Sequence, residues 1–298
     1  MGAEVIKVES MQGDDTRKWG PPWAEGGESA YFISLNRNKL SITIDMKHPD
    51  CKKIIEKLIQ RSDVLIENFI SGTAEKLGVG YEQASRMNKR LVYCSVTGFG
   101  TTGVYAKRPG YDAICSAMYG MMHITGEEGG SPVKPGVAVT DVLTGLLAHG
   151  AILSALYERT ISGLGQRVDT SLMEAQLSSL VNVASNYLIS GKDTSKRLGT
   201  GHPSIVPYQS FECKGGKYLS LAVGNDGQFR DFCKALGRAK WSRDMRFLTN
   251  SDRVRNRSVL IAMLEEIFKS ESVEHWLEAF ENKGFPCGPV RSIEEAFN

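Results

Sequence analysis

Residues 91–103, LVYCSVTGFGTTG, give the clearest indication of the fold. The first six residues, Leu91–Val96, form a near-continuous apolar run, and Val64–Glu67 (VLIE) is a second run of the same kind. Such runs are typical of strands that are buried on both faces of a parallel sheet. Residues 51–61 carry apolar side chains at helical spacing just before the second run. Strands separated by helices predict an α/β fold.

The glycines that follow the strand at 91–96 match the pattern GxGxxG, at Gly98, Gly100 and Gly103. This pattern indicates a dinucleotide site only when a helix begins directly after it. The next residues contain Pro109 and show no apolar helical period, so no helix N-terminus is expected to receive a pyrophosphate. The sequence therefore does not predict nicotinamide or flavin binding.

The second half of the chain changes character near residue 190. Ser171 and Glu174 form a capping box, which predicts the start of a helix that continues to Gly191. Polar, turn-rich sequence follows, and beyond it two short runs flank Gly215-Gly216, as in a β-hairpin. We therefore expect a large α/β domain, a linker and a smaller α+β domain. Their bounds are 1–190, 191–203 and 204–298.

Composition excludes several kinds of partner. The chain has 36 basic and 34 acidic residues, a net charge of +2, which gives no reason to expect nucleic acid or an anionic membrane. Its six cysteines include no CxxC pair, and no cluster has the spacing of a zinc site. The first residues do not read as a signal peptide. Reduced thiols in an intracellular compartment are expected. The most apolar stretch, 142–157, is short for a membrane span and predicts a buried helix.

Asp141, in the segment Gly136–Gly145, admits two interpretations. Aspartate is a common helix N-cap, and position alone favours that role. A carboxylate at a helix N-terminus also lies beside unpaired N–H groups and partial positive charge. These would keep Asp141 ionised and stabilise an oxyanion formed nearby, so the segment also suits nucleophilic catalysis.

Cationic and flexible residues near Asp141 are candidates for substrate contacts. Lys107 and Arg108 precede the sequence Pro-Gly-Tyr-Asp and would offer a counter-charge to an anionic substrate. His202 lies between Gly201 and Pro203 in a flexible loop, whose Gly199 and Gly201 suit a lid. No two histidines have metal-binding spacing, and a solvated or structural role is the alternative for each of these residues.

Several stretches resemble the class III CoA-transferases over nearly the whole chain, in order. They are GAEVIKVE (2–9), NRNKLSITIDMK (36–47), DVLIENF (63–69), RPGYDAICSAMYGMMHITG (108–126), DVLTGLLAHGAILSALYERTISGLGQ (141–166) and FPCGPV (285–290). Residues 123–126 and 199–209 are most similar to the succinyl-CoA:glutarate branch. The resemblance implies a Rossmann-like large domain and two interlocked chains, with coenzyme A as a substrate rather than a permanent cofactor and with no metal.

The resemblance also implies site residues and a reaction. The nucleophilic aspartate of the family falls on Asp141, which would attack the donor thioester and pass through an aspartyl-CoA thioester. The substrates would be a succinyl-CoA-like donor and a small carboxylic or dicarboxylic acid such as glutarate. The compartment would be the mitochondrial matrix in a eukaryote and otherwise the cytoplasm. The CoA-contacting positions of the family fall on Ile44, Lys47, Asn68, Phe69, Lys76 and Tyr111.

This sequence departs from the family pattern in two ways. Ser10 occupies a position where members often carry an arginine that meets the CoA phosphates, so that anchor is either missing here or replaced by Arg17 or Lys18. Tyr111 stands where the related racemases have a histidine. Tyrosine, with an ordinary pKa of about 10, is a poor base near neutral pH, which favours a transferase over a racemase.

Family members begin with a strand and helix before residue 2 and continue beyond residue 298, so the chain reads as a shortened form. The missing strand is expected in the middle of the sheet. A truncated, non-catalytic CoA-binding protein therefore remains an alternative to the enzyme.

Overall fold

The structure, a computed structural model, describes residues 2–298, and these divide into two compact units. The first unit contains residues up to 119 together with 136–184. The second contains 120–135 together with 185–298. This differs from the expected linear division in three ways: residues 120–135 belong to the second unit, residues 185–190 also belong to it, and the expected linker at 191–203 is part of it rather than a separate segment. Each unit is described by itself below.

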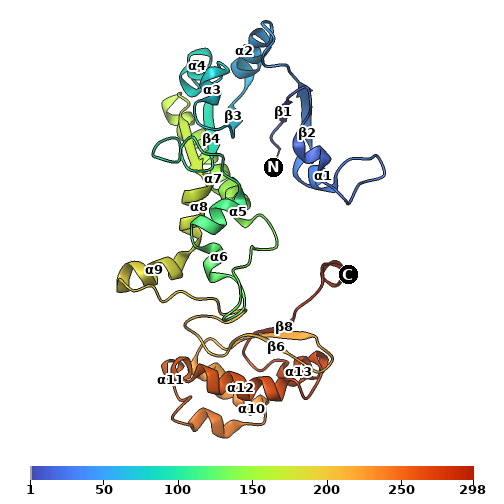
Figure 1. Ribbon diagram of the computed structural model, residues 1–298, viewed down its shortest axis with the longest axis vertical. Helices are drawn as coiled ribbons and strands as arrows, with labels where there is room; N and C mark the ends of the chain where they lie inside the picture. The colour runs from blue at the N-terminus through green and yellow to red at the C-terminus, as the bar shows by residue number, and fades with distance from the viewer. Residues whose placement is uncertain (1) are drawn as a thin grey trace. The chain divides into compact units, whose positions relative to one another are not determined.

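All five strands of the first unit run parallel, in two sheets (Figure 1). Strand β1 pairs with β2, and a second sheet has the order β3-β4-β5. The parallel pairing follows from the helices between successive strands, since a parallel pair needs a crossover connection. The bounds of the strands are β1 Val5–Glu9, β2 Lys39–Thr43, β3 Val64–Glu67, β4 Val92–Thr97 and β5 Arg167–Ser171.

The helices of the first unit connect and cover these strands. The short helices after β3 and β4 begin within the loops where the candidate CoA residues lie. Their bounds are η1 Asp15–Lys18, α1 Ala30–Asn36, α2 Cys51–Arg61, α3 Thr73–Lys76, α4 Tyr81–Met87, α5 Asp112–Met118, α7 Val139–Ser162 and α8 Leu172–Ser179. Helix α9, Val181–Ser190, continues into the second unit.

The core of the first unit lies around β4. Tyr93 is buried and its ring meets that of Tyr81 in α4, with the centroids 5.8 Å apart. Leu91 and Ala84 are buried in the same cluster. Because side chains alternate across a strand, Val92 and Cys94 face the opposite side of the sheet, and both are fully buried. Burial on both faces explains why β4 reads as a near-continuous apolar run.

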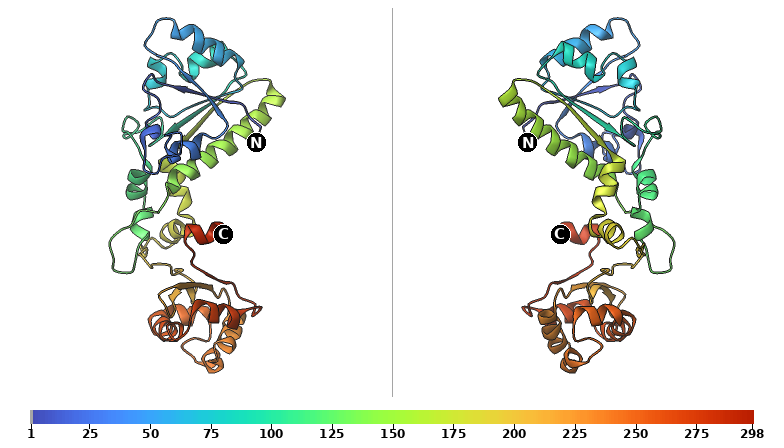
Figure 2. Two further views of the ribbon diagram at one scale, coloured as in Figure 1. Left: turned by 90° about the vertical axis from the view of Figure 1, so that its right-hand side faces the viewer. Right: turned by 90° about the vertical axis from the view of Figure 1, so that its left-hand side faces the viewer.

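Helix α7 crosses beside β4 and β5 (Figure 2). Its buried residues are small: Thr140, Thr144, Ala148 and Ala155. The expectation of a buried helix is wrong for most of α7, because larger apolar residues such as Tyr157, which is 72% exposed, point away from the unit. Among residues 2–298, α7 is also the one helix long and apolar enough to cross a membrane. Core helices of soluble proteins pass the same test of length and composition.

The predicted helix after Ser171 begins as expected but is interrupted. Ser171 accepts a hydrogen bond from the N–H of Glu174, so it caps the helix as predicted. The capping box is incomplete, because the carboxylate of Glu174 accepts from the Ser171 hydroxyl rather than from its backbone N–H. The helix is interrupted at Val181, whose φ of 44° is left-handed, a conformation that valine rarely adopts. Two helices, α8 and α9, therefore stand where one was expected.

The second unit is an antiparallel sheet covered by helices, in keeping with the predicted α+β character. The hairpin around Gly215-Gly216 is confirmed as β6 and β7, and β8 pairs with β7. Its core includes fully buried Phe211, Leu219 and Phe232. The bounds are α6 Met121–Ile124, β6 Tyr208–Glu212, β7 Tyr218–Ala222, α10 Asp226–Ala235, η2 Ala239–Arg243, α11 Asn250–Arg255, α12 Arg257–Phe268, α13 Val273–Phe280, β8 Cys287–Pro289 and α14 Ile293–Phe297.

Candidate functional site

Asp141 lies in the first turn of α7, as the third residue of the helix. The N-cap is Ala138, which has no side chain able to accept a hydrogen bond. The interpretation of Asp141 as the N-cap is therefore wrong. The residue is exposed, and within residues 2–298 its carboxylate has no hydrogen-bond partner. An exposed carboxylate without a structural partner is available for chemistry.

Asp112 takes the place of the missing N-cap. Its Oδ2 atom accepts the N–H of Thr140 at 2.8 Å and the N–H of Asp141 at 3.3 Å. Asp112 is buried at the first position of α5. A carboxylate at a helix N-terminus meets both the unpaired N–H groups and the positive end of the helix dipole. The N-terminus of a 24-residue helix is therefore capped from another helix.

This arrangement leaves no free N–H in the first turn of α7. Those of Thr140 and Asp141 are bonded to Asp112, while those of Val139 and Val142 bond to the carbonyls of Val137 and Ala138. The expectation that this turn offers unpaired donors to an oxyanion is wrong. Any oxyanion donors must come from other residues.

Electrostatics at Asp141 also differ from the expectation. Partial burial of the carboxyl group raises the pKa of Asp141, and the neighbouring charge of Asp112 raises it further. The helix dipole was expected to hold this carboxyl ionised, but the second carboxylate opposes that effect. A more basic carboxylate is a better nucleophile, so the shift favours attack on a carbonyl.

Thr140 ties the same turn to α8. Its Oγ1 donates to Oε1 of Gln176 at 2.7 Å, and Nε2 of Gln176 donates to Oγ of Ser179 at 2.9 Å. Thr140 and Gln176 are both buried. The backbone that carries Asp141 is thus held by α5 and by α8.

Tyr111 is brought next to this turn because it directly precedes Asp112. It is the N-cap of α5 and is 69% exposed. Of the predicted CoA-contacting residues, Tyr111 is the one that the structure connects with Asp141.

Three other predicted CoA-contacting residues follow β3. Asn68 and Phe69 come directly after the strand, and Lys76 ends α3. All three are exposed, and the N–H of Phe69 donates to the carboxylate of Glu67 at 2.8 Å. A small polar recess lies beside Phe69, between the loops after β3 and β4, and it includes buried Tyr93 and Ser95. These residues are positioned at the carboxyl end of the strand, where ligands bind in open α/β sheets.

Ile44 and Lys47 follow β2 and differ from each other. Lys47 is exposed, whereas the side chain of Ile44 is buried in the core. The N–H of Ile44 donates to the carbonyl of Glu9. A ligand would therefore meet Ile44 through its backbone.

The predicted substrate-binding residues lie in both units. Lys107 and Arg108 are exposed in the loop after β4, and the guanidinium of Arg108 lies 4.4 Å from the ring centroid of Tyr105. Gly199, Gly201 and His202 belong to the second unit.

His202 is not a cation in this structure. Its Nδ1 accepts the N–H of Ser204 at 3.0 Å, which requires that nitrogen to be unprotonated. Burial lowers the pKa of His202, and the nearby Arg257 lowers it further. His202 therefore supplies no positive charge near neutral pH, although its other ring nitrogen remains a donor.

The loop that carries Gly199 is joined to a second glycine-rich loop. The N–H of Gly199 donates to the carbonyl of Gly126 at 2.9 Å. Arg197 donates to the carbonyls of His123 and Gly130, and Lys196 pairs with Glu128 at 2.9 Å. The two loops of the second unit are thus held together by hydrogen bonds and an ion pair.

The glycine pattern at 98–103 serves a backbone contact. No helix begins until residue 112, as predicted. A Cβ atom on Gly98 would lie 2.6 Å from the Cα atom of Gly110. The two backbone segments therefore pass too closely for any residue other than glycine at position 98. The motif therefore folds the loop after β4 onto α5.

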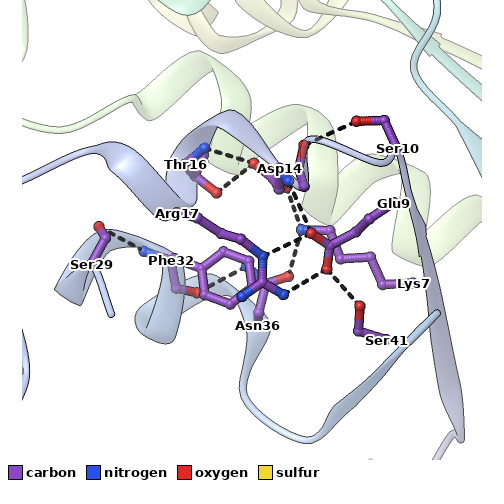
Figure 3. A network of polar contacts seen from close by, with 11 residues as sticks. Lys7, Glu9, Ser10, Asp14, Thr16, Arg17, Ser29, Phe32, Asn36 and Ser41 are labelled. Carbon is purple, nitrogen blue, oxygen red and sulfur yellow. Dashed lines mark hydrogen bonds and ion pairs between the residues drawn. The ribbon is translucent and has the colours of Figure 1, made fainter. Parts of the chain in front are cut away.

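Arg17 has a different role from the one expected (Figure 3). Its Nε and Nη2 donate to the two carboxylate oxygens of Glu9, each at 2.8 Å. Its guanidinium also lies over the ring of Phe32, 4.0 Å from the centroid. Because Glu9 uses both donors, Arg17 is not a replacement for the phosphate anchor missing at Ser10. Lys18 is the remaining candidate, and it is exposed.

Sequence reasoning missed Asp112, Thr140 and Gln176. Asp112 and Gln176 are polar residues buried within apolar helices, and a buried polar side chain needs a partner. Their types gave that signal, but the partners lie 28 to 36 residues away.

The cysteine thiols and the potential metal ligands are the remaining groups that could carry chemistry. All six cysteines are free, and burial raises the pKa of Cys115, near Asp141, to about 11, so this thiol is inert. Among residues 2–298, no three His, Cys, Asp or Glu side chains are grouped as metal ligands.

Comparisons with known proteins agree with the resemblance. The whole chain, 1–298, matches the family described as CoA-transferase family III. It is 47% identical to succinyl-CoA:glutarate CoA-transferase of Mus musculus, covering 100% of this chain and 68% of that protein. It is 44% identical to succinate–glutarate CoA-transferase of Agrobacterium fabrum, covering 100% of this chain and 75% of that one.

A solved structure gives the same answer for the fold. A CAIB/BAIF family protein from Brucella suis is 45% identical, with a TM-score of 0.86, over 99% of this chain and 79% of that chain. The mixed α/β fold is therefore that of known relatives. The chain belongs to CoA-transferase family III and is a CoA-transferase, for which CoA thioesters are substrates rather than bound cofactors.

Proposed function

We propose that this protein transfers coenzyme A from a succinyl-CoA-like donor to a small dicarboxylic acid such as glutarate, through a thioester on Asp141. One observation carries the choice of substrates: the chain is 46–47% identical, over its full length, to two mammalian succinyl-CoA:glutarate CoA-transferases. The available carboxylate of Asp141 supports the choice of nucleophile.

The chemistry requires a covalent intermediate because a carboxylate is a weak nucleophile toward a thioester. A carboxylate oxygen of Asp141 attacks the donor carbonyl and the C–S bond breaks. The CoA thiolate departs, and a mixed anhydride between Asp141 and the donor acyl group is formed. The thiolate then attacks the Asp141 carbonyl and releases the donor acid, which gives the aspartyl-CoA thioester. The acceptor carboxylate repeats these two steps in reverse order and leaves as its CoA ester.

The residues around Asp141 support this role. Burial and the charge of Asp112 raise the pKa of Asp141, which increases its nucleophilicity. Tyr111 provides no base at neutral pH, which favours transfer over proton removal at a carbon. The anhydride must be kept from water, and the joined loops containing Gly126 and Gly199 suit a lid.

The CoA moiety would lie along the ends of the strands of the first unit. Lys47, Asn68, Phe69, Lys76 and Tyr111 would contact it through side chains and Ile44 through its backbone. Lys18 would meet its phosphates. Arg108, held over the ring of Tyr105, would pair with the distal carboxylate of the acceptor. Lys107 would add positive charge, and His202 would donate a neutral hydrogen bond.

The assembly and location follow the same reasoning. We propose a Rossmann-like large domain and an interlocked homodimer, which the exposed apolar side chains on α7 support. An intracellular site, the mitochondrial matrix in a eukaryote, agrees with six free cysteines.

The test is mass spectrometry of the intact protein after incubation with succinyl-CoA, with hydroxylamine added to trap the activated carboxyl group. A hydroxamate that peptide mapping places on Asp141, and that is absent in Asp141→Asn, would support the proposal. Asp169→Asn is the matched control and should keep the adduct on Asp141, because Asp169 is an exposed aspartate whose side chain pairs with Arg167. Absence of the adduct from folded protein that binds CoA would contradict it.

A further inference from the structure

Asp112 is a buried aspartate that contacts the backbone of the proposed nucleophile. Its Oδ2 atom accepts two N–H groups, one from Asp141 and one from the residue before it. The acceptor comes from α5, a different helix from the one that it caps. Helices are usually capped by a residue of their own chain segment, and Ala138 leaves that position without an acceptor.

The hydrogen bonds at Asp141 involve its backbone and leave its carboxylate without a partner among residues 2–298. Asp112 on α5 accepts the backbone N–H groups of Thr140 and Asp141, and Gln176 on α8 holds the Thr140 side chain. The carboxylate of Asp141 has no hydrogen-bond partner among residues 2–298. The nucleophile is thus held through its backbone while its reactive oxygens stay available.

Position matters more than stability in such a case. Loss of a helix cap costs about 1 kcal/mol of stability wherever the cap lies. A displacement of a reacting group by about 1 Å can slow a reaction about 100-fold. A carboxylate that fixes the backbone of a nucleophile should therefore affect rate far more than it affects folding.

We propose that Asp112 is a positioning residue: it fixes the backbone of Asp141 against α5, so that the Asp141 carboxylate meets the thioester carbonyl in a reactive geometry. This inference rests on the proposed role of Asp141 as nucleophile. Asp112 itself forms no bond to the substrate and accepts no proton in the reaction.

The test is the single-turnover rate of Asp141 acylation by succinyl-CoA in three variants. Asp112→Ala removes the acceptor and should slow acylation about 10- to 100-fold, with the Kd for CoA unchanged within about twofold. Asp112→Asn keeps a carbonyl oxygen in place and should restore the rate to within about threefold of the wild-type rate. Asp112→Leu keeps the branching of asparagine at Cγ, with a larger side chain and no acceptor, so it replaces the alanine variant if that protein does not melt cooperatively.

A cap in the other unit provides the control. The side chain of Asn225 accepts the N–H of Gln228 and caps α10. Asn225→Ala should lower stability as Asp112→Ala does, but leave acylation unchanged.

Two results would overturn the inference. One is acylation at the wild-type rate in Asp112→Ala or Asp112→Leu. The other is an Asp112→Asn variant that melts like the wild type yet is as slow as the alanine variant. If the wild-type protein itself forms no Asp141 adduct, the proposed function fails instead, so the two failures are distinguishable.

Discussion

Glu9 and Asp141 are two carboxylates of the same unit with opposite surroundings. Glu9 is buried and accepts two hydrogen bonds from Arg17 and one from Ser41 (Figure 3). The bonds from Arg17, followed by that from Ser41, outweigh burial and lower the pKa of Glu9 to about 2. Asp141 is exposed, has a second carboxylate beside it, and has a raised pKa.

The difference separates structural from chemical use of a carboxylate. The oxygens of Glu9 are all engaged, so its charge stabilises the connection between β1 and the segment 10–17 and cannot attack a substrate. The carboxylate oxygens of Asp141 have no hydrogen-bond partner among residues 2–298, whereas its backbone N–H donates to Asp112. Perturbed carboxyl groups without a cationic partner are candidates for catalysis.

Replacement of the nucleophile should give the largest effect. Asp141→Ala is expected to lower kcat by a factor of about a thousand or more, because no other group offers a covalent route. The Kd for CoA should change little, since Asp141 forms no part of the expected CoA contacts. Steady-state kinetics and calorimetry of CoA binding measure the two quantities. Turnover within tenfold of the wild type would contradict the role of Asp141.

The matching substitution at the structural carboxylate should affect folding. Arg17→Met leaves the buried carboxylate of Glu9 without its cation. The lowering of the Glu9 pKa from 4.5 to about 2 corresponds to about 3 kcal/mol. Because the Arg17 side chain is 38% exposed, solvent screening should reduce this to about 2 kcal/mol. Urea unfolding at neutral pH measures the free energy of unfolding.

Arg167→Met is the control for this substitution. Arg167 pairs with Asp169 in an exposed ion pair on β5, and such pairs contribute about 0–1 kcal/mol. An equal loss of stability in both variants would show that the Glu9–Arg17 pair has no special structural role.

The same pair predicts how stability depends on pH. A carboxyl group whose pKa is lower in the folded state stabilises the protein above its unfolded pKa, and this stability is lost as pH falls through the folded pKa. For Glu9 the window runs from pH 4.5 down to about 2. The Arg17→Met variant should lose less stability across that window than the wild type. Thermal melting at a series of pH values would test this, and parallel curves would contradict it.

Local sequence predicted the elements whose causes are local. The strand at 64–67 was placed within its observed bounds, and Ser171 caps its helix through the N–H of Glu174 as expected. The absence of a helix after Gly103 also followed from the residues there. In each case the deciding groups lie within a few positions of one another.

The parts that could not be predicted depend on distant contacts. Nothing near Asp112 indicates that its carboxylate caps a helix 28 residues later. That contact holds the backbone N–H of Asp141, and the charge of Asp112 adds to the rise in the pKa of Asp141 that burial causes. Arg17 was assigned to a phosphate from its charge alone, because its pairing with Glu9 depends on how the segment after β1 folds back.

Substitution of the proposed acceptor contact should have a moderate effect. Arg108→Met is expected to raise the KM for glutarate about 10-fold and the KM for a monocarboxylic acid of similar length by less than twofold, because only glutarate has a second carboxylate to pair with Arg108. Lys107→Met, at the neighbouring exposed position, should change both by less than about threefold. Steady-state kinetics with both acceptors provide the comparison. An equal increase for both acids would remove Arg108 from substrate recognition.

The smallest effect should be a gain in stability when Asp141 is neutralised. A carboxyl group whose pKa is raised by folding favours the folded state when protonated, and that advantage is lost as pH rises through the folded pKa. At neutral pH the ionised Asp141 is therefore a cost, which Asp141→Asn removes. Since the residue is exposed, we expect the Tm to rise by only about 1–2 °C. Below pH 3.8 the Asp141 carboxyl group is protonated in both the folded and the unfolded protein, so the gain in Tm should vanish.

The equivalent change at the structural carboxylate, Glu9→Gln, should instead lower the Tm at neutral pH. Opposite signs for these two neutral substitutions, measured by calorimetry under one set of conditions, would show that the fold gives up stability at Asp141 and gains it at Glu9, as expected when an active residue is held against its own preference. The same sign for both would mean that Asp112 and Arg17 do not distinguish the two carboxylates.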